Sequence, residues 1–295
     1  MSPPLRAPLP ALRRSWRPSP LIRGSVAMHV GAAVAVLVRP PAWPWALSAV
    51  LANHLLLTAA GLWPRSRWLG PNWTHLPPAA ASGGCSVPEA PGAAAAVALT
   101  LDDGPDPDVT GRVLDLLDAH GASATFFCIG DRVARHPGLA RAIVARGHEI
   151  GNHSYRHLKR FSLLGPRGLG AEIRRAQQAI LDATGEVPRF FRAPAGLRNP
   201  FLEPVLAQEG LQLVSWTRRG FDTVNGSPGA VLGRLTRRLQ AGDILLLHDG
   251  HAARTAAGAP VILEVLPRLL AVLATAHLTP ITLAAALARA AAPLT

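Results

Sequence analysis

The stretch "ALTLDDGPDP", residues 98–107, sets two carboxylates side by side at the end of an apolar run. The run is typical of a buried strand, and the Gly-Pro-Asp-Pro that follows is typical of a turn. Neighbouring strand residues point to opposite faces, so Asp102 and Asp103 cannot both take the same exposed position. A buried carboxylate is costly without a partner. The pair is therefore either an ordinary turn or helix N-cap, or part of a polar site.

From about residue 96 the chain alternates between apolar, strand-like runs and amphipathic helix patterns. The expected strands are 96–102, 123–129, 148–152, 189–193, 211–217, 243–248 and 279–282. The expected helices are 109–120, 137–146, 170–184, 200–209, 228–240 and 261–276. Alternation of this kind predicts a parallel sheet, either open or closed into a barrel. The first turn is not a Gly-rich phosphate loop, which disfavours a nucleotide-binding fold.

Polar side chains stand where most of these strands end. They are Asp102 and Asp103 after the first strand, His153 and His157 after the third, Arg192 at the end of the fourth, Asp222 after the fifth and His248 at the end of the sixth. The carboxyl ends of parallel strands form one rim, where barrel enzymes build their active sites. A set of polar residues repeated around one rim therefore predicts a functional site.

The stretch "HSYRH", residues 153–157, spaces two histidines four residues apart. On a helical turn such side chains share one face, so two imidazoles can contact one ion. Taken alone, a surface or capping pair of histidines explains the spacing better. With one aspartate the set becomes two histidines and a carboxylate, with positions left for water or substrate. That is a catalytic zinc-type set.

The adjacent aspartates then take separate roles. One binds the ion, and the other acts nearby as a base that removes a proton from the activated water. Arg192 and Asp222 are expected to hold this base in place, the arginine through a charge-assisted hydrogen bond. His248 suits the acid that protonates the leaving group, because the pKa range of histidine lies near neutrality.

Over residues 94–285 the chain resembles the polysaccharide deacetylases, which include chitin, chitooligosaccharide and peptidoglycan N-deacetylases. The stretches "TLDDGP" (100–105), "HSYRH" (153–157), "RAPAG" (192–196) and "LLH" (246–248) resemble that family's first, second, third and fifth motifs in order and spacing. The resemblance implies a distorted (β/α) barrel of about seven parallel strands. It also implies metal-dependent hydrolysis of an N-acyl group on an amino sugar, with one divalent ion that is usually zinc and sometimes cobalt or nickel.

The resemblance also implies a role for each matching residue. The metal ligands would be Asp103, His153 and His157. Asp102 would be the base, Arg192 would orient it, and His248 would be the acid.

Three further positions would contact the substrate, and the chain departs from the family pattern close to two of them. The third motif usually has an aromatic residue after the proline, but here Ala195 follows Pro194. The backbone N–H of Ala195 would still serve the oxyanion site. The fourth motif usually has Asp followed by Trp, but here it is Asp222-Thr223, next to an acyl pocket that Leu246 would line. Both departures affect which substrate is expected more than which reaction is expected.

The first 63 residues have the features of a membrane anchor that precedes the barrel. Apolar segments occupy 24–38 and 42–63, and the second carries no formal charge and has tryptophans near its ends. Its length is enough for about 33 Å of helix, and terminal tryptophans are typical of membrane interfaces. A cleaved signal peptide is the alternative, but the second, longer segment favours a retained anchor. The expected division is 1–23 basic Pro-rich tail, 24–63 two membrane segments, 64–93 linker and 94–295 catalytic domain.

Positive charge is concentrated at the front of the chain. The net charge is +12, and eight arginines but no acidic residue precede Glu89. A two-span hairpin would put seven of these arginines on one side and only Arg39 on the other. This favours a domain on the cytoplasmic side of the inner membrane, whereas a single span would put it on the periplasmic side. Front-loaded charge also favours a membrane-lipid partner.

Other partners are not indicated by the sequence. Basic clusters interleaved with aromatic residues, as nucleic-acid-binding domains have, are not seen in the folded part. No protein partner is evident. Cys85 and Cys128 lack metal-type spacing and do not make a disulfide framework.

Three functions remain open at this level. The first is hydrolysis of an N-acyl group, expected to be N-acetyl, from an amino sugar of a polysaccharide, oligosaccharide or glycolipid. The second is a deformylase or deacylase of a lipid-linked sugar at the inner leaflet, and this function is favoured if the domain lies in the cytoplasm. The third is a non-catalytic carbohydrate-binding module, which should have lost the base, a ligand or the acid; all of these are present.

Overall fold

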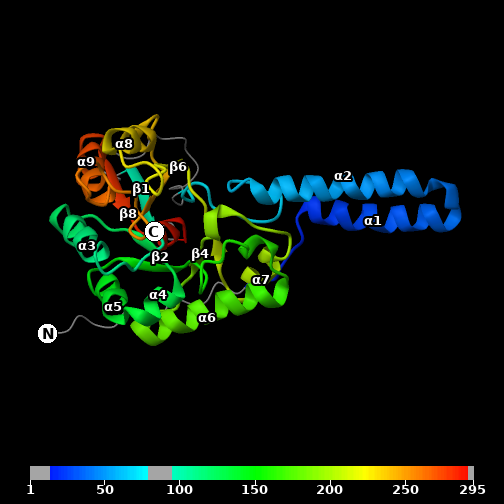
Figure 1. The fold of residues 1–295 in the computed structure, drawn as a ribbon, viewed down its shortest axis with the longest axis horizontal. Helices are drawn as coiled ribbons and strands as arrows, with labels where there is room; N and C mark the ends of the chain where they lie inside the picture. Colours follow the sequence, from blue (N-terminus) through cyan, green and yellow to red (C-terminus); the bar gives the residue numbers. More distant parts are fainter. Residues whose placement is uncertain (1–13, 79–94, 292–295) are drawn as a thin grey trace.

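The computed structural model describes residues 14–78 and 95–291 and consists of an α/β domain with a two-helix hairpin projecting from it (Figure 1). Most of the expected basic tail, the second half of the expected linker and Cys85 lie outside the described residues. Cys128 is buried in the domain with a free thiol.

The domain is built on one parallel sheet. Its strands are β1 (Ala95–Asp102), β2 (Thr125–Cys128), β3 (Glu149–Asn152), β4 (Phe190–Phe191), β5 (Gln212–Leu213), β6 (Arg218–Arg219), β7 (Ile244–His248) and β8 (Leu278–Ile281). The order is β5-β4-β3-β2-β1-β7-β6, and β8 pairs with the first half of β1. In the described part β5 and β6 are not paired with each other, so the barrel is open there. This arrangement confirms the distorted barrel of about seven parallel strands.

Helices pack around the sheet. They are α3 (Thr110–Ala119), α4 (Gly130–Arg135), α5 (Pro137–Ala145), α6 (Pro166–Thr184), α7 (Leu202–Gln208), α8 (Pro228–Thr236), α9 (Ile262–Thr275) and α10 (Leu283–Ala291), with 3-10 turns η2 (Phe161–Leu163) and η3 (Pro194–Gly196). The sequence patterns did not predict α4 and α10. The expected strand over 211–217 is reduced to β5, and directly after β5 Val214 pairs with Trp73 through an isolated bridge.

The central strand β1 explains how the fold positions a site. Its side chains alternate: Val97, Leu99 and Leu101 join the core beneath the outer helices, while Ala98 joins the core inside the barrel. Strands that are buried on both faces have continuous apolar sequences, as β1 has. By this alternation the last residue of the strand, Asp102, faces the barrel interior. Its neighbour in the register with β7 is His248.

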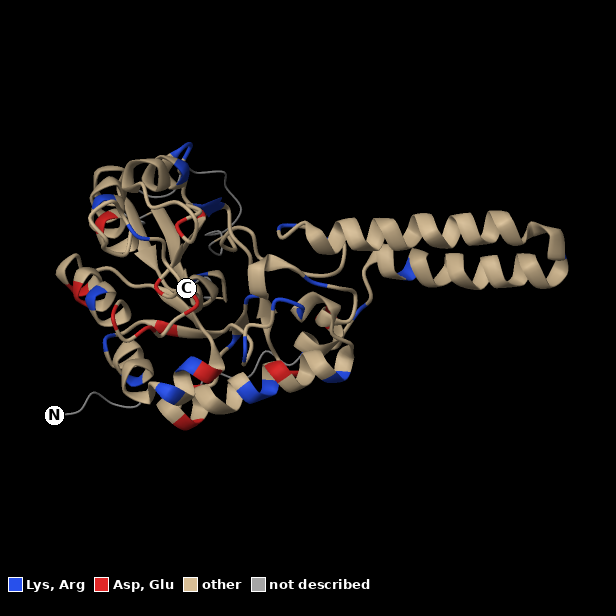
Figure 2. Cartoon of the chain, in the orientation of Figure 1, with Lys and Arg blue, Asp and Glu red and all other residues tan. Residues whose placement is uncertain are grey.

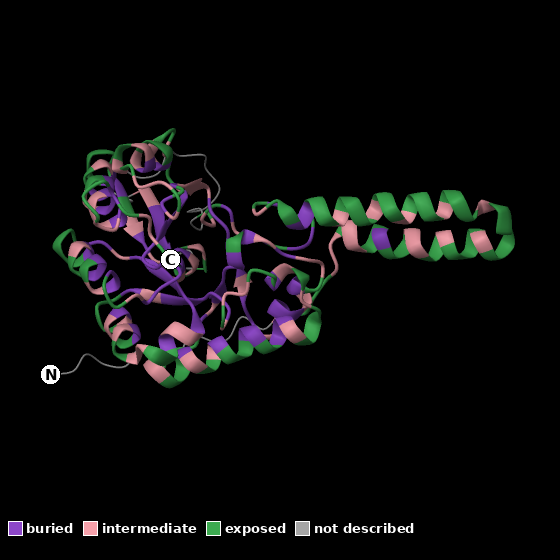
Figure 3. Cartoon of the chain, in the orientation of Figure 1, coloured by how far each residue is buried: buried purple, intermediate pink, exposed green. Residues whose placement is uncertain are grey.

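The hairpin consists of α1 (Pro20–Val38), the turn η1 (Pro40–Ala42) and α2 (Trp43–Leu62). Both helices are long and apolar enough to cross a membrane. Their side chains are largely exposed, in contrast to the buried interior of the domain (Figure 3), and few of them are charged (Figure 2). Polar bonds join the two helices, since Asn53 Nδ2 donates to Ser25 Oγ at 2.8 Å. The two helices are thus a candidate membrane anchor.

The chain between the hairpin and the sheet packs against the domain over residues 64–78. Trp73 pairs with Val214 beyond β5, and the N–H of Leu76 donates to the carbonyl of Gly242 in front of β7. The Trp73 ring also contacts Phe190 of β4. This segment therefore occupies the gap between the two ends of the sheet.

Candidate active site

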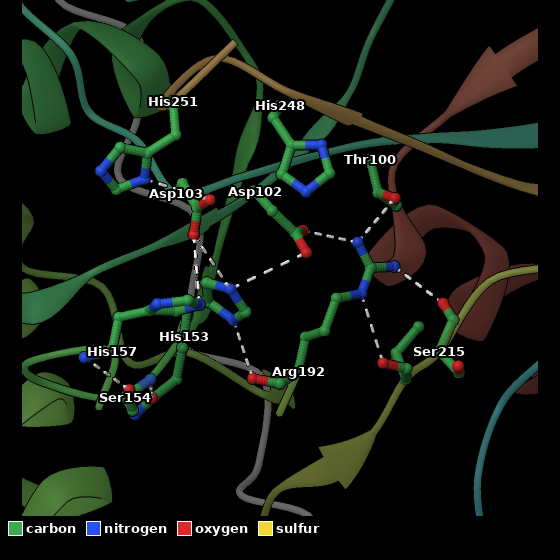
Figure 4. A network of polar contacts seen from close by, with 12 residues as sticks. Thr100, Asp102, Asp103, His153, Ser154, His157, Arg192, Ser215, His248 and His251 are labelled. Carbon is green, nitrogen blue, oxygen red and sulfur yellow. Dashed lines mark hydrogen bonds and ion pairs between the residues drawn. The ribbon is translucent and has the colours of Figure 1, made fainter. Parts of the chain in front are cut away.

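The two adjacent carboxylates face the same space because the chain turns sharply between them. Asp102 ends β1 on its inward face, and Asp103 follows with a φ of 70°. A positive φ breaks the alternation of strand side chains, which would otherwise send Asp103 to the opposite face. Both carboxylates consequently approach one imidazole: Asp102 Oδ2 lies 3.8 Å and Asp103 Oδ1 3.4 Å from His153 Nε2 (Figure 4).

Asp103, His153 and His157 form a candidate metal site. One carboxylate oxygen, Asp103 Oδ1, is 3.4 Å from Nε2 of each histidine, and the three ligand atoms lie within 4.8 Å of one another. Two ligands that are each 2.0–2.1 Å from a tetrahedral ion are about 3.4 Å apart. Asp103 Oδ1 is buried and has no hydrogen-bond partner among the described residues. An uncompensated buried carboxylate oxygen between two imidazole nitrogens fits a divalent cation.

The histidine pair meets on a loop, and the expectation of a helical turn is wrong. Ser154 and His157 have φ values of 61° and 49°, so the backbone reverses within the motif. The N–H of His157 donates to Ser154 Oγ, and the N–H of Ser154 donates to the side chain of Asn152. These local bonds bring the two rings to a centroid distance of 4.8 Å.

Hydrogen bonds and charge orient these groups, and they put Asp103 and His157 in the forms that ligate metal. His153 Nδ1 donates to the carbonyl of Arg192 at 2.9 Å, which leaves Nε2 as the free acceptor. Burial and the nearby His153 lower the pKa of His157 to about 4. Burial raises the pKa of Asp103, but hydrogen bonds and the charges of neighbouring histidines lower it more, so this carboxyl is ionised at neutral pH. Burial lowers the pKa of His153, but Asp102 and Asp103 raise it by more than burial lowers it, so the net shift is upward.

Asp102 is held by Arg192, as the sequence predicts. Arg192 is fully buried, and its Nη1 donates to Asp102 Oδ1 at 2.6 Å and to Thr100 Oγ1 at 2.9 Å. The other guanidinium nitrogens donate to the carbonyls of Val214 and Ser215 (Figure 4). With Oδ1 engaged in this way, Oδ2 of Asp102 is directed toward the histidines.

The expectation that Asp222 helps to hold Arg192 and the base is wrong. Its Oδ1 accepts from His248 Nδ1 at 2.8 Å, and its Oδ2 accepts from the backbone N–H of the same histidine at 2.7 Å. Arg192 instead donates to the backbone carbonyls of Val214 and Ser215, and both oxygens of Asp222 are engaged by His248. The Asp222 bond engages Nδ1 of His248 and leaves Nε2 without a bond among the described residues, and Figure 4 shows this ring directed toward Asp102.

The structure adds two residues that the sequence patterns missed. His251 Nδ1 donates to Asp103 Oδ2 at 3.3 Å, and His251 Nε2 accepts from Arg132 Nη2 at 2.9 Å. The oxygen of Asp103 that does not face the histidine pair is therefore engaged. The signal was present in "HDGH" (248–251), where a second histidine follows the predicted acid three residues later.

The three predicted substrate-contacting residues lie on two elements of the rim. Pro194 and Ala195 form η3 directly after β4; Pro194 is buried, and Ala195 is exposed with a φ of 53°. Leu246 is buried in β7, where its neighbours Leu245 and Leu247 belong to the outer core. By alternation Leu246 therefore shares the inward face with His248.

Comparisons with known proteins agree with this geometry. The family model for polysaccharide deacetylase matches residues 89–214. The chain is 35% identical to a peptidoglycan-N-acetylglucosamine deacetylase of Bacillus cereus over 181 residues, which cover 59% of this chain and 81% of that protein. It is 38% identical to a chitooligosaccharide deacetylase of a Bradyrhizobium species over 156 residues, covering 52% of this chain and 71% of the relative.

Solved structures share the fold. A family 4 carbohydrate esterase from Streptomyces lividans, in complex with acetate, has 36% identity and a TM-score of 0.57, covering 63% of this chain and 91% of that one. A family 4 pseudoenzyme from Bacillus anthracis has 24% identity and a TM-score of 0.57, covering 64% of this chain and 63% of that one. Because enzymes and a pseudoenzyme share this fold, the argument for activity rests on the individual side chains.

Proposed function

This chain belongs to the polysaccharide deacetylase family, and we propose that it hydrolyses an N-acyl group, in the simplest case N-acetyl, from an amino sugar with the help of one divalent metal ion. Asp103, His153 and His157 would hold the ion, with zinc the first candidate and cobalt or nickel the alternatives. A bound ion would supply Lewis acidity to the amide carbonyl and to the attacking water. The shared position of Asp103 Oδ1, 3.4 Å from both imidazole nitrogens, is the observation that carries this proposal.

Asp102 would act as the base. Arg192 donates to one of its carboxylate oxygens, Oδ1, and the other, Oδ2, lies 3.8 Å from Nε2 of the predicted ligand His153. In this position Asp102 would accept a proton from water as the oxygen attacks the amide carbon. The amide C–N bond then breaks, and the new C–O bond remains in the released carboxylate.

His248 would act as the acid. It donates from Nδ1 to Asp222, so Nε2 is the nitrogen that would deliver a proton to the departing amine. Burial lowers the pKa of His248, but the hydrogen bond and charge of Asp222, together with the charges of Asp102 and Asp103, raise it more, so the net shift is upward. An upward shift keeps the imidazole protonated to a higher pH, which suits an acid near neutrality.

The presence of the full set of chemical groups favours an enzyme over a non-catalytic carbohydrate-binding module. The test is acetate release from chitotetraose by the full chain, measured as purified, after chelator treatment and after addition of zinc. We expect chelation to abolish release and zinc to restore it. Formate release from an N-formyl analogue would reveal the deformylase alternative, and sugar binding without any acyl release would contradict the proposal.

We also propose that the hairpin spans the inner membrane, with the domain and both chain ends on the cytoplasmic side. The division of the chain would then be a basic tail over 1–23, membrane segments over 24–63, a connecting segment over 64–93 and a catalytic domain over 94–295. Arginine counting supports this orientation. A reporter enzyme fused after the last residue tests it: activity of a cytoplasm-dependent reporter is expected, and activity of a periplasm-dependent reporter would contradict the orientation.

A further inference from the structure

The base of the hairpin is fixed to the domain at the end of α2. The N–H of Arg198 donates to the carbonyl of Gly61 at 3.1 Å, and the Arg198 guanidinium donates to the carbonyl of Ser66. Asn72 Nδ2 donates to the carbonyls of Pro64 and Ser66 at 2.9 and 3.0 Å. Buried hydrogen bonds of this kind hold the two parts in one orientation, because breaking them would leave polar groups without partners.

The start of α1 is fixed as well. Ser19, the N-cap of α1, donates from Oγ to the carbonyl of Trp68 at 2.6 Å. Arg14, ahead of the helix, forms an ion pair with the buried Glu203 of α7. Both helices of the hairpin are thus attached to the domain at one end, and Figure 1 shows them projecting away from it together.

One loop joins this base to the candidate active site. The loop begins at Arg192, whose carbonyl accepts from His153, and continues through Gly196 to Arg198. Pro64 lies against Gly196, where an added Cβ would be 2.6 Å from the Pro64 ring. Six residue steps separate Arg192 from Arg198, so the chain between them spans at most about 22 Å. Arg198 is bonded to Gly61 near the end of α2, and Arg192 is bonded to the predicted ligand His153, so the end of α2 is held at a short, fixed distance from the metal site.

Exposed apolar side chains surround the base of the hairpin. This collar consists of Trp63, Trp68, Leu163 and Phe201, with exposed fractions of 54, 52, 83 and 51%. Asn199, two residues before Phe201, donates from Nδ2 to the carbonyls on either side of Leu163, so the loops that carry Phe201 and Leu163 are bonded to each other. At the opposite end of the hairpin Trp43 and Trp45 are exposed too. Aromatic residues at both ends of an apolar hairpin are typical of the two membrane–water interfaces.

We propose that the substrate is the amino-sugar headgroup of a membrane-anchored glycolipid, in the leaflet that the collar contacts. This inference rests on the proposed deacetylase function. The collar places the membrane surface at the base of the hairpin, and the loop over 192–198 keeps the site a short, fixed distance from that surface. An enzyme and a substrate held in one surface meet at a raised effective concentration, but only if the tether length matches the distance between them.

The test uses the full chain in phospholipid liposomes and a series of defined probes. Each probe is N,N′-diacetylchitobiose attached to a dialkylglycerol anchor, either directly or through 12 ethylene glycol units. Free diacetylchitobiose is the soluble probe at the same bulk concentration. We expect acetate release from the directly anchored probe to be at least tenfold faster than from the soluble probe, and faster than from the long-spacer probe.

Equal or faster release from the soluble probe would overturn the inference while leaving the deacetylase function intact. Release from the long-spacer probe without release from the directly anchored one would also overturn it, because the site would then lie far from the surface. Absence of acetate from every probe would contradict the deacetylase function itself.

A pair of variants separates the collar from a general surface effect. Phe201→Glu puts a charge in the collar, and we expect it to lower the ratio of anchored to soluble probe turnover at least fivefold. Val187→Glu is the matched control, since Val187 is similarly exposed at 57% but lies in the loop before β4. An unchanged ratio in Phe201→Glu would overturn the role of the collar.

Discussion

Asp222 binds His248 through both of its carboxylate oxygens: one accepts a hydrogen bond from the ring Nδ1 at 2.8 Å, and the other accepts from the backbone N–H at 2.7 Å. This pairing fixes the ring, selects the tautomer and raises the pKa of the imidazole against the lowering effect of burial. It replaces the predicted contact between Asp222 and Arg192. The two halves of the proposed acid–base machinery are thus held separately, the base by Arg192 and the acid by Asp222.

Replacing Asp222 by Asn should move the alkaline limb of kcat/KM to lower pH. His248 must be protonated to act as an acid, and the negative charge of Asp222 favours that form. Without this charge the pKa of His248 falls, so activity is lost at a lower pH than in the parent protein. The measurement is a pH–rate profile of acetate release. Asp182→Asn, on the exposed face of α6, is the control, and an alkaline limb unmoved by Asp222→Asn would assign it to another group.

Asp102→Asn should stop turnover but keep the metal. Loss of a general base lowers kcat about 10²- to 10⁴-fold, whereas the three predicted ligands remain. Metal content by elemental analysis should therefore stay near that of the parent. Asp103→Asn is the matched variant next to it and should lose metal and activity together. Equal metal loss in the two variants would refute the separate roles of the adjacent carboxylates.

His251→Ala should weaken metal binding although His251 is not among the three ligands. Its Nδ1 donates to the Asp103 oxygen that faces away from the histidine pair, which orients the other oxygen toward His153 and His157. Removing such a supporting bond typically costs 10- to 100-fold in metal affinity. Competition with a chromophoric chelator measures this, with the exposed His120→Ala as control. Rescue by His251→Gln, which can donate to the same oxygen, would separate orientation from simple loss of packing.

Arg192→Met should lower the free energy of unfolding by about 3–5 kcal/mol, because it leaves the Asp102 carboxylate buried without its partner. Arg174→Met is the control: its ion pair with Glu209 lies at the surface and is worth about 0–1 kcal/mol. Chemical denaturation of the detergent-solubilised chain measures both. The double variant Asp102→Asn/Arg192→Met should recover part of the loss. A loss in Arg192→Met no greater than in Arg174→Met would contradict a dependence of the buried carboxylate on Arg192.

Much of the fold was accessible from the residue pattern. The alternation of apolar runs and amphipathic stretches from residue 96 follows from strands that are covered on both faces and helices that are covered on one. Asp102, Asp103 and the histidine pair could be found because they interrupt that pattern at strand ends. The helices α4 and α10 were missed: α4 is only six residues long, and α10 lies next to the C-terminus in an Ala-rich stretch with few polar residues to mark its faces.

Periodicity was enough for a parallel sheet of alternating strands and helices, for the apolar hairpin and for the group of residues at the rim, since these depend on local patterns of burial. The distorted barrel was expected only from the family resemblance, because periodicity alone left an open and a closed sheet equally possible. Only the folded chain revealed that Asp222 holds His248, why the adjacent aspartates face one space, and how the base of the hairpin is bonded to the loop that leads to the site. Those features depend on the positive φ of Asp103 and on hydrogen bonds between loops far apart in sequence, such as His248 with Asp222 and Arg198 with Gly61. The direction of a side chain at a loop and the choice among several acceptors are set by the three-dimensional packing of the strands, and no pattern along the chain encodes them separately.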